Sequence, residues 1–209
     1  LRVRGGVAQF LERRLVPEAA LGRFRAALRS AFRLRNSIVA ELLIIAIIYP
    51  FSYYMRGDVL VLESATWYAQ LENGGSAATL AGQWFLWVSN PIYQFLILRW
   101  YFRLFIWARF LWQVSRIDLN LIPTHPDRNA GLGFLDGSAY ALSPLLTAHG
   151  AAVAGFLANR IFYAGASLTD FRLEILVLVV FLMLMVLGPL CVFAPKILGA
   201  RRKGMREYG

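Results

Sequence analysis

The chain has 209 residues, of which 58% are apolar and only 16% are charged, and its mean hydropathy is +0.54. Soluble domains contain about 45–50% apolar and about 25% charged residues, so this composition excludes an ordinary soluble domain and predicts an integral membrane protein. The net charge of +10 gathers beside apolar segments, in residues 2–35 and 196–206, which favours contact with the anionic head groups of a lipid bilayer over binding to nucleic acid.

The first segment, residues 1–36, is predicted to be a basic amphipathic arm. Its apolar residues recur at spacings of three and four: Leu21, Phe24, Leu28 and Phe32. Arginines occupy the other faces of the same stretch. This pattern predicts a helix that begins near Pro17 and lies at the membrane interface.

Four apolar segments follow, and each is long enough to cross the hydrocarbon core as a helix. We place these spans at 37–54, 78–98, 138–163 and 171–193. The second helix is expected to continue past the bilayer to residue 116, with a kink at Pro91, because proline removes one helical hydrogen bond. The expected fold is therefore an all-α integral membrane protein with a four-helix transmembrane domain over 37–195, an interfacial N-terminal helix and a long, kinked second helix.

The third span contains rows of small residues at a spacing of four, including Gly150 and Ala154 in one row and Ala151 and Gly155 in another. Such rows allow helix backbones to approach closely. We expect them to serve packing within the chain rather than a dedicated dimer contact.

The distribution of Lys and Arg predicts the topology. The N-terminal arm contains nine arginines and the stretch from Lys196 contains five basic residues, whereas the 55–77 loop contains only Arg56 and the 164–170 turn contains none. Both ends are therefore predicted to be cytoplasmic, as is the 117–137 loop. Residues 196–209 form a basic cytoplasmic tail, which we expect to continue in a longer protein.

The 117–137 loop contains the compact polar stretch THPDRNAGLGFL, residues 124–135. His125, Asp127 and Arg128 are its candidate binding residues, and Gly131 and Gly133 permit backbone conformations that other residues avoid. We expect Asp127 to accept hydrogen bonds from the following backbone amides or to pair with an arginine. Two interpretations stay open: an ordered structural turn, or a site for a ligand, ion or partner.

The longer string LIPTHPDRNAGLGFL, residues 121–135, resembles the cytoplasmic loop of a group of bacterial multi-pass membrane proteins. Those loops usually have a second glycine where this chain has Ala130. The group has no established activity. The resemblance therefore implies an integral membrane protein, which we expect in the bacterial inner membrane.

Ionisable residues in or beside the spans are the other candidates for binding or gating, because each costs about 2.5–3.5 kcal/mol at the centre of a membrane helix. They are Glu41, Arg99, Arg103, His149 and Arg160. For the three arginines, extension of the charged group to the interface is an equally good explanation. For Glu41 and His149, we expect a polar contact between helices or a water-filled path.

Metal and haem sites are not expected. His125 and His149 are the only histidines, and neither has a second histidine or a cysteine at a ligand spacing. No other cofactor motif is present.

Three classes of function fit these features. The first is an oligomeric channel or transporter, favoured by proline-disturbed helices and scarce charges near the bilayer. The second is a membrane scaffold or accessory subunit of a larger complex that docks a protein through the basic arm and the 117–137 loop. The third is a membrane-embedded enzyme, which ranks last because no acid–base or nucleophile pair stands out.

Overall fold

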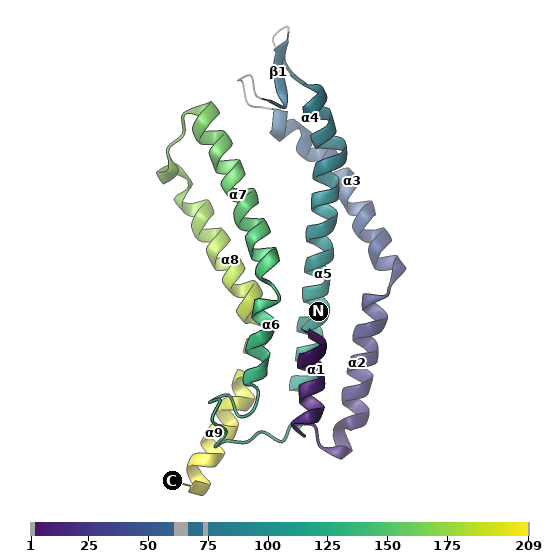
Figure 1. Ribbon diagram of the computed structural model, residues 1–209, viewed down its shortest axis with the longest axis vertical. Helices are drawn as coiled ribbons and strands as arrows, with labels where there is room; N and C mark the ends of the chain where they lie inside the picture. The colour runs from purple at the N-terminus through teal and green to yellow at the C-terminus, as the bar shows by residue number, and fades with distance from the viewer. Residues whose placement is uncertain (1–2, 61–66, 73–74, 209) are drawn as a thin grey trace. The chain divides into compact units, whose positions relative to one another are not determined.

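The computed structural model describes residues 3–60, 67–72 and 75–208, and most of them are helical (Figure 1). The predicted all-α fold is confirmed. Within the described ranges, two helices are long and apolar enough to cross a membrane, at 133–164 and 168–191. A third qualifies if 18–35 and 38–54 form one bent span. A membrane location is thus supported.

The third and fourth predicted spans correspond to the two apolar helices, whereas four spans in all remain a prediction. The second predicted span is not among the helices that meet the criterion of length and hydropathy. The helix at this position contains polar residues, including Gln83, Asn90, Gln94 and Arg99, which lower its mean hydropathy.

The chain divides into two compact units, each built from segments that are distant in sequence. Unit 1 contains Leu1–Asn36, Leu104–Thr147 and Val177–Gly209. Unit 2 contains Ser37–Arg103 and Ala148–Leu176.

The N-terminal part of the chain forms three α-helices and one short 3-10 turn. They are α1 (Val3–Glu12), the 3-10 turn Glu18–Ala20, α2 (Leu21–Arg35) and α3 (Ile38–Leu60). The helix predicted to start near Pro17 is present, since Pro17 precedes the 3-10 turn that leads into α2. Helix α1 was not predicted, because its two adjacent glycines have low helix propensity.

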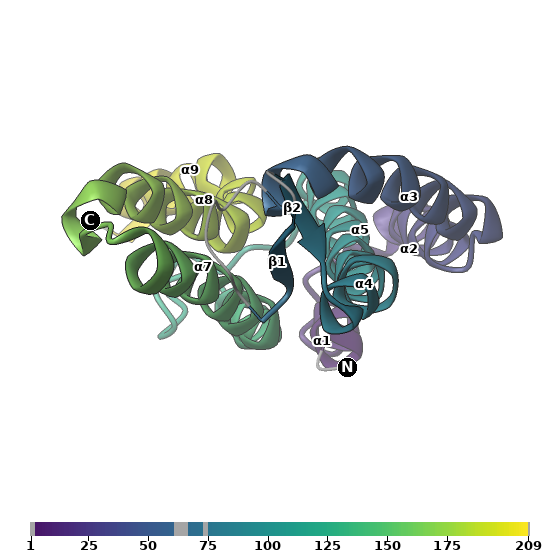
Figure 2. The same ribbon diagram turned by 90° about the horizontal axis from the view of Figure 1, so that it is seen from above.

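A two-stranded antiparallel hairpin precedes the long helix. Strand β1 (Ala69–Glu72) pairs with β2 (Gly75–Ala78), with Ala69 opposite Ala78. The hairpin lies beside α4 (Leu80–Trp84), as Figure 2 shows. The hairpin falls in the segment 55–77, which is predicted to be a loop, because strands this short show no clear alternation of apolar and polar residues.

The hairpin is held to α4 by a helix cap. The Thr79 hydroxyl accepts from the backbone N–H of Gly82 at 3.0 Å and donates to the carbonyl of Trp67 at 2.9 Å. A Cβ on Gly82 would lie 2.0 Å from the carbonyl oxygen of Tyr68, so only glycine allows this approach. The hairpin is thus connected to the start of the following helix.

Helical residues run consecutively from Leu80 to Ser115. After α4 come a π-helical turn (Phe85–Ser89) and α5 (Asn90–Ser115). The π turn lies next to Pro91, which has no N–H to donate to the preceding turn, and π turns commonly absorb such interruptions. The helix ends within one residue of the predicted position, whereas a kink at Pro91 remains a prediction.

The C-terminal part of the chain forms four helices separated by short turns. They are α6 (Asp136–Tyr140), α7 (Ser143–Ala164), α8 (Arg172–Cys191) and α9 (Ala194–Tyr208). The third predicted span is therefore interrupted near residues 141–142. Asp170 accepts from the backbone N–H of Ser167 at 2.9 Å and closes the capping box that leads into α8. The predicted tail is a helix, α9.

Unit 1 has an aromatic core to which the N-terminal arm contributes. Phe10 and Phe24 are at most 1% exposed, and their rings are 5.8 Å apart. Phe24 also contacts Phe110 of α5 at 5.8 Å, and Ala27 of α2 is buried in the same cluster. The apolar face of α2 therefore packs against protein at these positions, while Phe32 remains 41% exposed. An interfacial location for the arm stays a prediction.

The small-residue rows of α7 are exposed in the structure. A Cβ placed at Gly150 or Gly155 would meet nothing within 4 Å in the part of the chain that the structure describes. Ala151 and Ala154 are exposed as well. Among the described residues, Gly150 and Gly155 therefore have no close neighbour, and packing of these rows within the chain stays a prediction.

Candidate functional site

The polar loop lies in unit 1, between α5 and α6, and it is a series of ordered turns. Backbone hydrogen bonds join His125 N–H to the Ile122 carbonyl at 3.1 Å and Arg128 N–H to the His125 carbonyl at 3.2 Å. Arg128, Ala130 and Gly131 have positive φ values of 56°, 55° and 94°. Glycine adopts this conformation most easily, so Arg128 and Ala130 hold a backbone conformation that residues with a Cβ rarely adopt.

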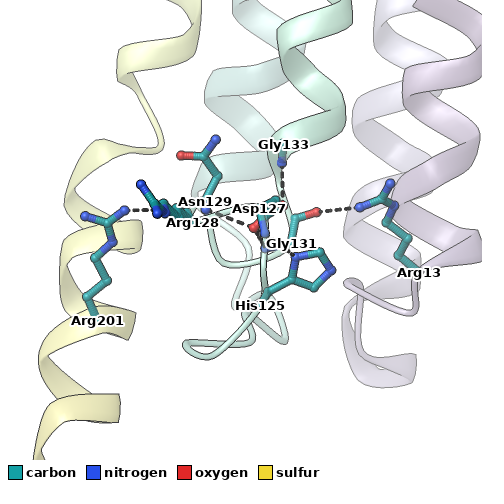
Figure 3. Close-up of polar contacts among 8 residues, drawn as sticks. All are labelled: Arg13, His125, Asp127, Arg128, Asn129, Gly131, Gly133 and Arg201. Atoms are coloured by element: carbon teal, nitrogen blue, oxygen red, sulfur yellow. Dashed lines mark hydrogen bonds and ion pairs between the residues drawn. The ribbon is translucent and has the colours of Figure 1, made fainter.

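Asp127 lies at the centre of the loop, and its carboxylate organises the backbone around it (Figure 3). Oδ1 accepts from the backbone N–H groups of Asn129 at 2.9 Å and Gly131 at 3.1 Å, and Oδ2 accepts from that of Gly133 at 2.8 Å. The predicted bonding of Asp127 to the following amides is confirmed. A Cβ on Gly133 would lie 3.0 Å from Oδ2, so the small residue allows this bond.

These contacts determine the protonation state of Asp127. Burial opposes ionisation of the carboxyl group, but the hydrogen bonds from Gly133, Asn129, Gly131 and His125 outweigh it and lower the pKa from 3.8 to about 2. The side chain is therefore a fixed anion at neutral pH. Since both oxygens already have donors, Asp127 is suited to hold the loop rather than to transfer protons.

His125 belongs to the same network. Its Nδ1 lies 2.9 Å from Asp127 Oδ1 and 3.2 Å from the backbone nitrogen of Asp127. One ring nitrogen cannot donate and accept at once, and the shorter contact to an ionised carboxylate favours donation from Nδ1–H. The ring is 27% exposed. His125 is thus oriented by Asp127, which leaves Nε2 as its second polar atom.

Two arginines from other segments hold the loop from opposite sides (Figure 3). Arg13 donates to the carbonyl of Gly131 at 3.4 Å, and its guanidinium lies over the ring of Phe134 at 5.2 Å. Arg201 of α9 donates to the carbonyl of Arg128. Neither Arg13 nor Arg201 is among the predicted site residues, because a partner distant in sequence leaves no local pattern.

Helix α9 packs directly on the start of the loop. A Cβ on Gly204 would lie only 2.6 Å from Cβ of Pro123. The ammonium group of Lys196 donates to the carbonyl of Ile117 and lies 3.7 Å from the carboxylate of Asp118. The arm, the loop and the tail helix therefore belong to one packed body.

In unit 2, polar side chains join α3 to α5. Glu41 and Arg99 form an ion pair with 3.0 Å between Oε1 and Nη2. The Ser52 hydroxyl donates to Gln94 Oε1 at 2.9 Å. The interhelical contact expected for Glu41 is thus present. Ser52 and Gln94 are not among the predicted site residues, although a polar residue in an apolar helix is a signal for such a contact.

A second polar contact in unit 2 joins α5 to α7. The Tyr101 hydroxyl is hydrogen-bonded to Nε2 of His149, and the two rings meet edge to face with 5.4 Å between their centroids. His149 therefore makes the interhelical contact expected for it. Two predicted candidates of unit 2 instead lie over aromatic rings of their own helices: Arg103 over Trp100 at 5.8 Å and Arg160 over Phe156 at 5.4 Å.

Within the ranges that the structure describes, no three His, Cys, Asp or Glu side chains gather as metal ligands would. The polar contacts described above lie in the loop of unit 1 and between the helices of unit 2. Comparisons of the chain with protein-family profiles, curated proteins and solved structures find no match.

Proposed function

We propose that the protein is a multi-pass inner-membrane channel or transporter that works as an oligomer, with the Glu41–Arg99 pair beside its path. The pair is the observation that supports this proposal. Its side chains are 3.0 Å apart, yet they remain 42% and 43% exposed on two helices of high apolar content. Charges exposed to hydrocarbon would be costly, so a water-lined path or a neighbouring subunit is the favourable environment for them.

Further polar contacts extend the same region of unit 2. Gln94 and Tyr101 contact α3 and α7, respectively. Their positions are seven residues apart on α5, which corresponds to about 10 Å along a helix. A series of contacts over this length supports a polar path better than a single structural bridge would.

Ion selectivity of the full chain in liposomes tests the proposal. Arg99→Gln leaves the Glu41 carboxylate without its counter-charge, and we expect the permeability ratio of K⁺ to Cl⁻ to rise. Glu41→Gln leaves the guanidinium instead, and we expect the same ratio to fall. Each shift should be about tenfold, equivalent to about 1.4 kcal/mol. The double variant should return towards the wild-type ratio.

Arg103→Gln is the matched control, because it removes the same charge one helical turn away, where the guanidinium lies over Trp100. We expect a much smaller change in the permeability ratio. A wild-type protein that conducts no better than empty liposomes, or two single variants that shift the ratio in the same direction, would contradict the proposal.

The scaffold function remains a second candidate, and one observation favours it. The arm and the loop are joined by a hydrogen bond from Asn120 N–H to the Leu15 carbonyl at 2.8 Å, so a single partner can contact both segments. A stoichiometric acidic partner that is released by Arg25→Glu with Arg29→Glu, in a protein that shows no flux, would favour this function.

A further inference from the structure

A groove in unit 1 lies between helix α9 and the start of the polar loop. Its volume is about 640 Å³. Its lining combines loop residues with one face of α9: Pro123, Thr124, Leu198, Arg201, Arg202 and Met205. The close approach of Gly204 to Pro123 holds the two sides together. Neither the ion pair of unit 2 nor the Asp127 network uses this groove.

The α9 side of the groove is both apolar and cationic. Leu198, Arg201, Arg202 and Met205 follow spacings of three, four and seven, so they share one helix face. Leu198 is 54% exposed and Met205 is 68% exposed. Exposed apolar side chains next to guanidinium groups match a ligand with an anionic head and an apolar chain.

The position of α9 in the chain points to the membrane surface. The helix begins at Ala194, directly after the apolar helix 168–191, which is long enough to cross a bilayer. Arg202 is eight residues into α9, about 12 Å along its axis. The groove therefore begins close to the end of a membrane-spanning segment, where lipid head groups are found.

We propose that this groove binds the head group of an anionic phospholipid. Arg201 is already oriented by its bond to the carbonyl of Arg128, and a guanidinium has further N–H groups that can bind the phosphate. Arg202 contributes a second charge, and the Thr124 hydroxyl can donate to the same phosphate. Leu198 and Met205 contact the acyl chains. The inference rests on the membrane placement in the proposed function, not on the ion path.

Lipid binding to the full chain in detergent tests this inference, with native mass spectrometry to count bound lipids. The probe is phosphatidylglycerol, and phosphatidylcholine is the zwitterionic reference. We expect wild type to retain phosphatidylglycerol preferentially, and Arg202→Gln to weaken that binding about fivefold, the effect of one basic residue near an anionic lipid. Met205→Gln should weaken binding of long-chain phosphatidylglycerol, because Met205 contacts the acyl chains. The soluble head group glycerophosphoglycerol should compete for the site equally well in this variant and in wild type.

Arg25→Gln is the control, because it removes an equal charge from an exposed position on α2 of the same unit. It should weaken phosphatidylglycerol binding clearly less than Arg202→Gln does, because the arm contributes only diffuse attraction. Equal losses in both Arg variants would indicate diffuse attraction and overturn the site. Equal retention of the two lipids, or displacement of phosphatidylglycerol by millimolar inorganic phosphate, would overturn it as well. Because the readout involves no ion flux, retained lipid selectivity without flux would contradict only the proposed function.

Discussion

Asp127 shows how one side chain organises a loop. Three backbone N–H groups and His125 surround its carboxylate, and each contact favours the ionised form. The same contacts hold Arg128 and Ala130 in a left-handed conformation that costs free energy for residues other than glycine. The polar cluster in the middle of an apolar chain therefore has a structural role, whatever else it binds.

Asp127→Asn is expected to lower the free energy of unfolding of the full chain by about 2 kcal/mol. The NH2 group of asparagine cannot accept a hydrogen bond, so one of these backbone N–H groups would lose its acceptor. Thermal unfolding in detergent measures this effect. The difference in stability between wild type and variant should shrink as the pH falls from about 4 to about 2. Folding lowers the pKa of Asp127 from 3.8 to about 2, so the ionised carboxylate stabilises the protein above pH 3.8. This contribution disappears as the pH falls through about 2.

Asp118→Asn is the control for this prediction, because the Asp118 side chain is 98% exposed. It should leave the unfolding temperature nearly unchanged. If the two variants unfolded alike at every pH, the network around Asp127 would not stabilise the protein.

At the scale of elements, α9 and the polar loop approach closely because Gly204 has no side chain. Gly204 is buried against Pro123, whereas Gly199, on the same helix, has nothing within 4 Å of its added Cβ. Both glycines are in helix α9, so the effect of an added methyl group at each position depends on its neighbours and not on the helix.

Gly204→Ala should destabilise unit 1 by about 1–3 kcal/mol, since Pro123 belongs to a turn and cannot move away freely. Gly199→Ala should be neutral or stabilising by up to about 1 kcal/mol, because alanine favours helix. Thermal unfolding and proteolysis of α9 in the full chain compare the two. Equal stability of both variants would mean that α9 does not pack on the loop in this way.

For the whole molecule, the arginine distribution predicts both ends on the cytoplasmic side. In a Cys191→Ser background, a cysteine at Ser64 should react with a membrane-impermeant maleimide added to intact cells. Ser64 lies outside the described residues, so the prediction rests on sequence alone. A cysteine at Asn129 should react only after the cells are opened, and its labelling from outside would reverse the topology.

Periodic and local features could be read from the amino-acid order. The apolar runs that became α7 and α8, the spacing that became α2, and the amides that surround Asp127 all involve residues within a few turns of one another. Local geometry determines such features, because a helix period or a turn leaves a regular trace in the sequence.

Contacts between distant segments could not be read in this way. The Glu41–Arg99 pair, the approach of Arg201 to the loop and the burial of Phe24 against Phe110 each join segments more than 50 residues apart. An amphipathic helix indicates that one face avoids water, but either lipid or protein can cover that face. Only the folded chain therefore showed that the arm of this protein buries Phe24 against Phe110 of α5, because nothing in the arm's own sequence distinguishes the two environments.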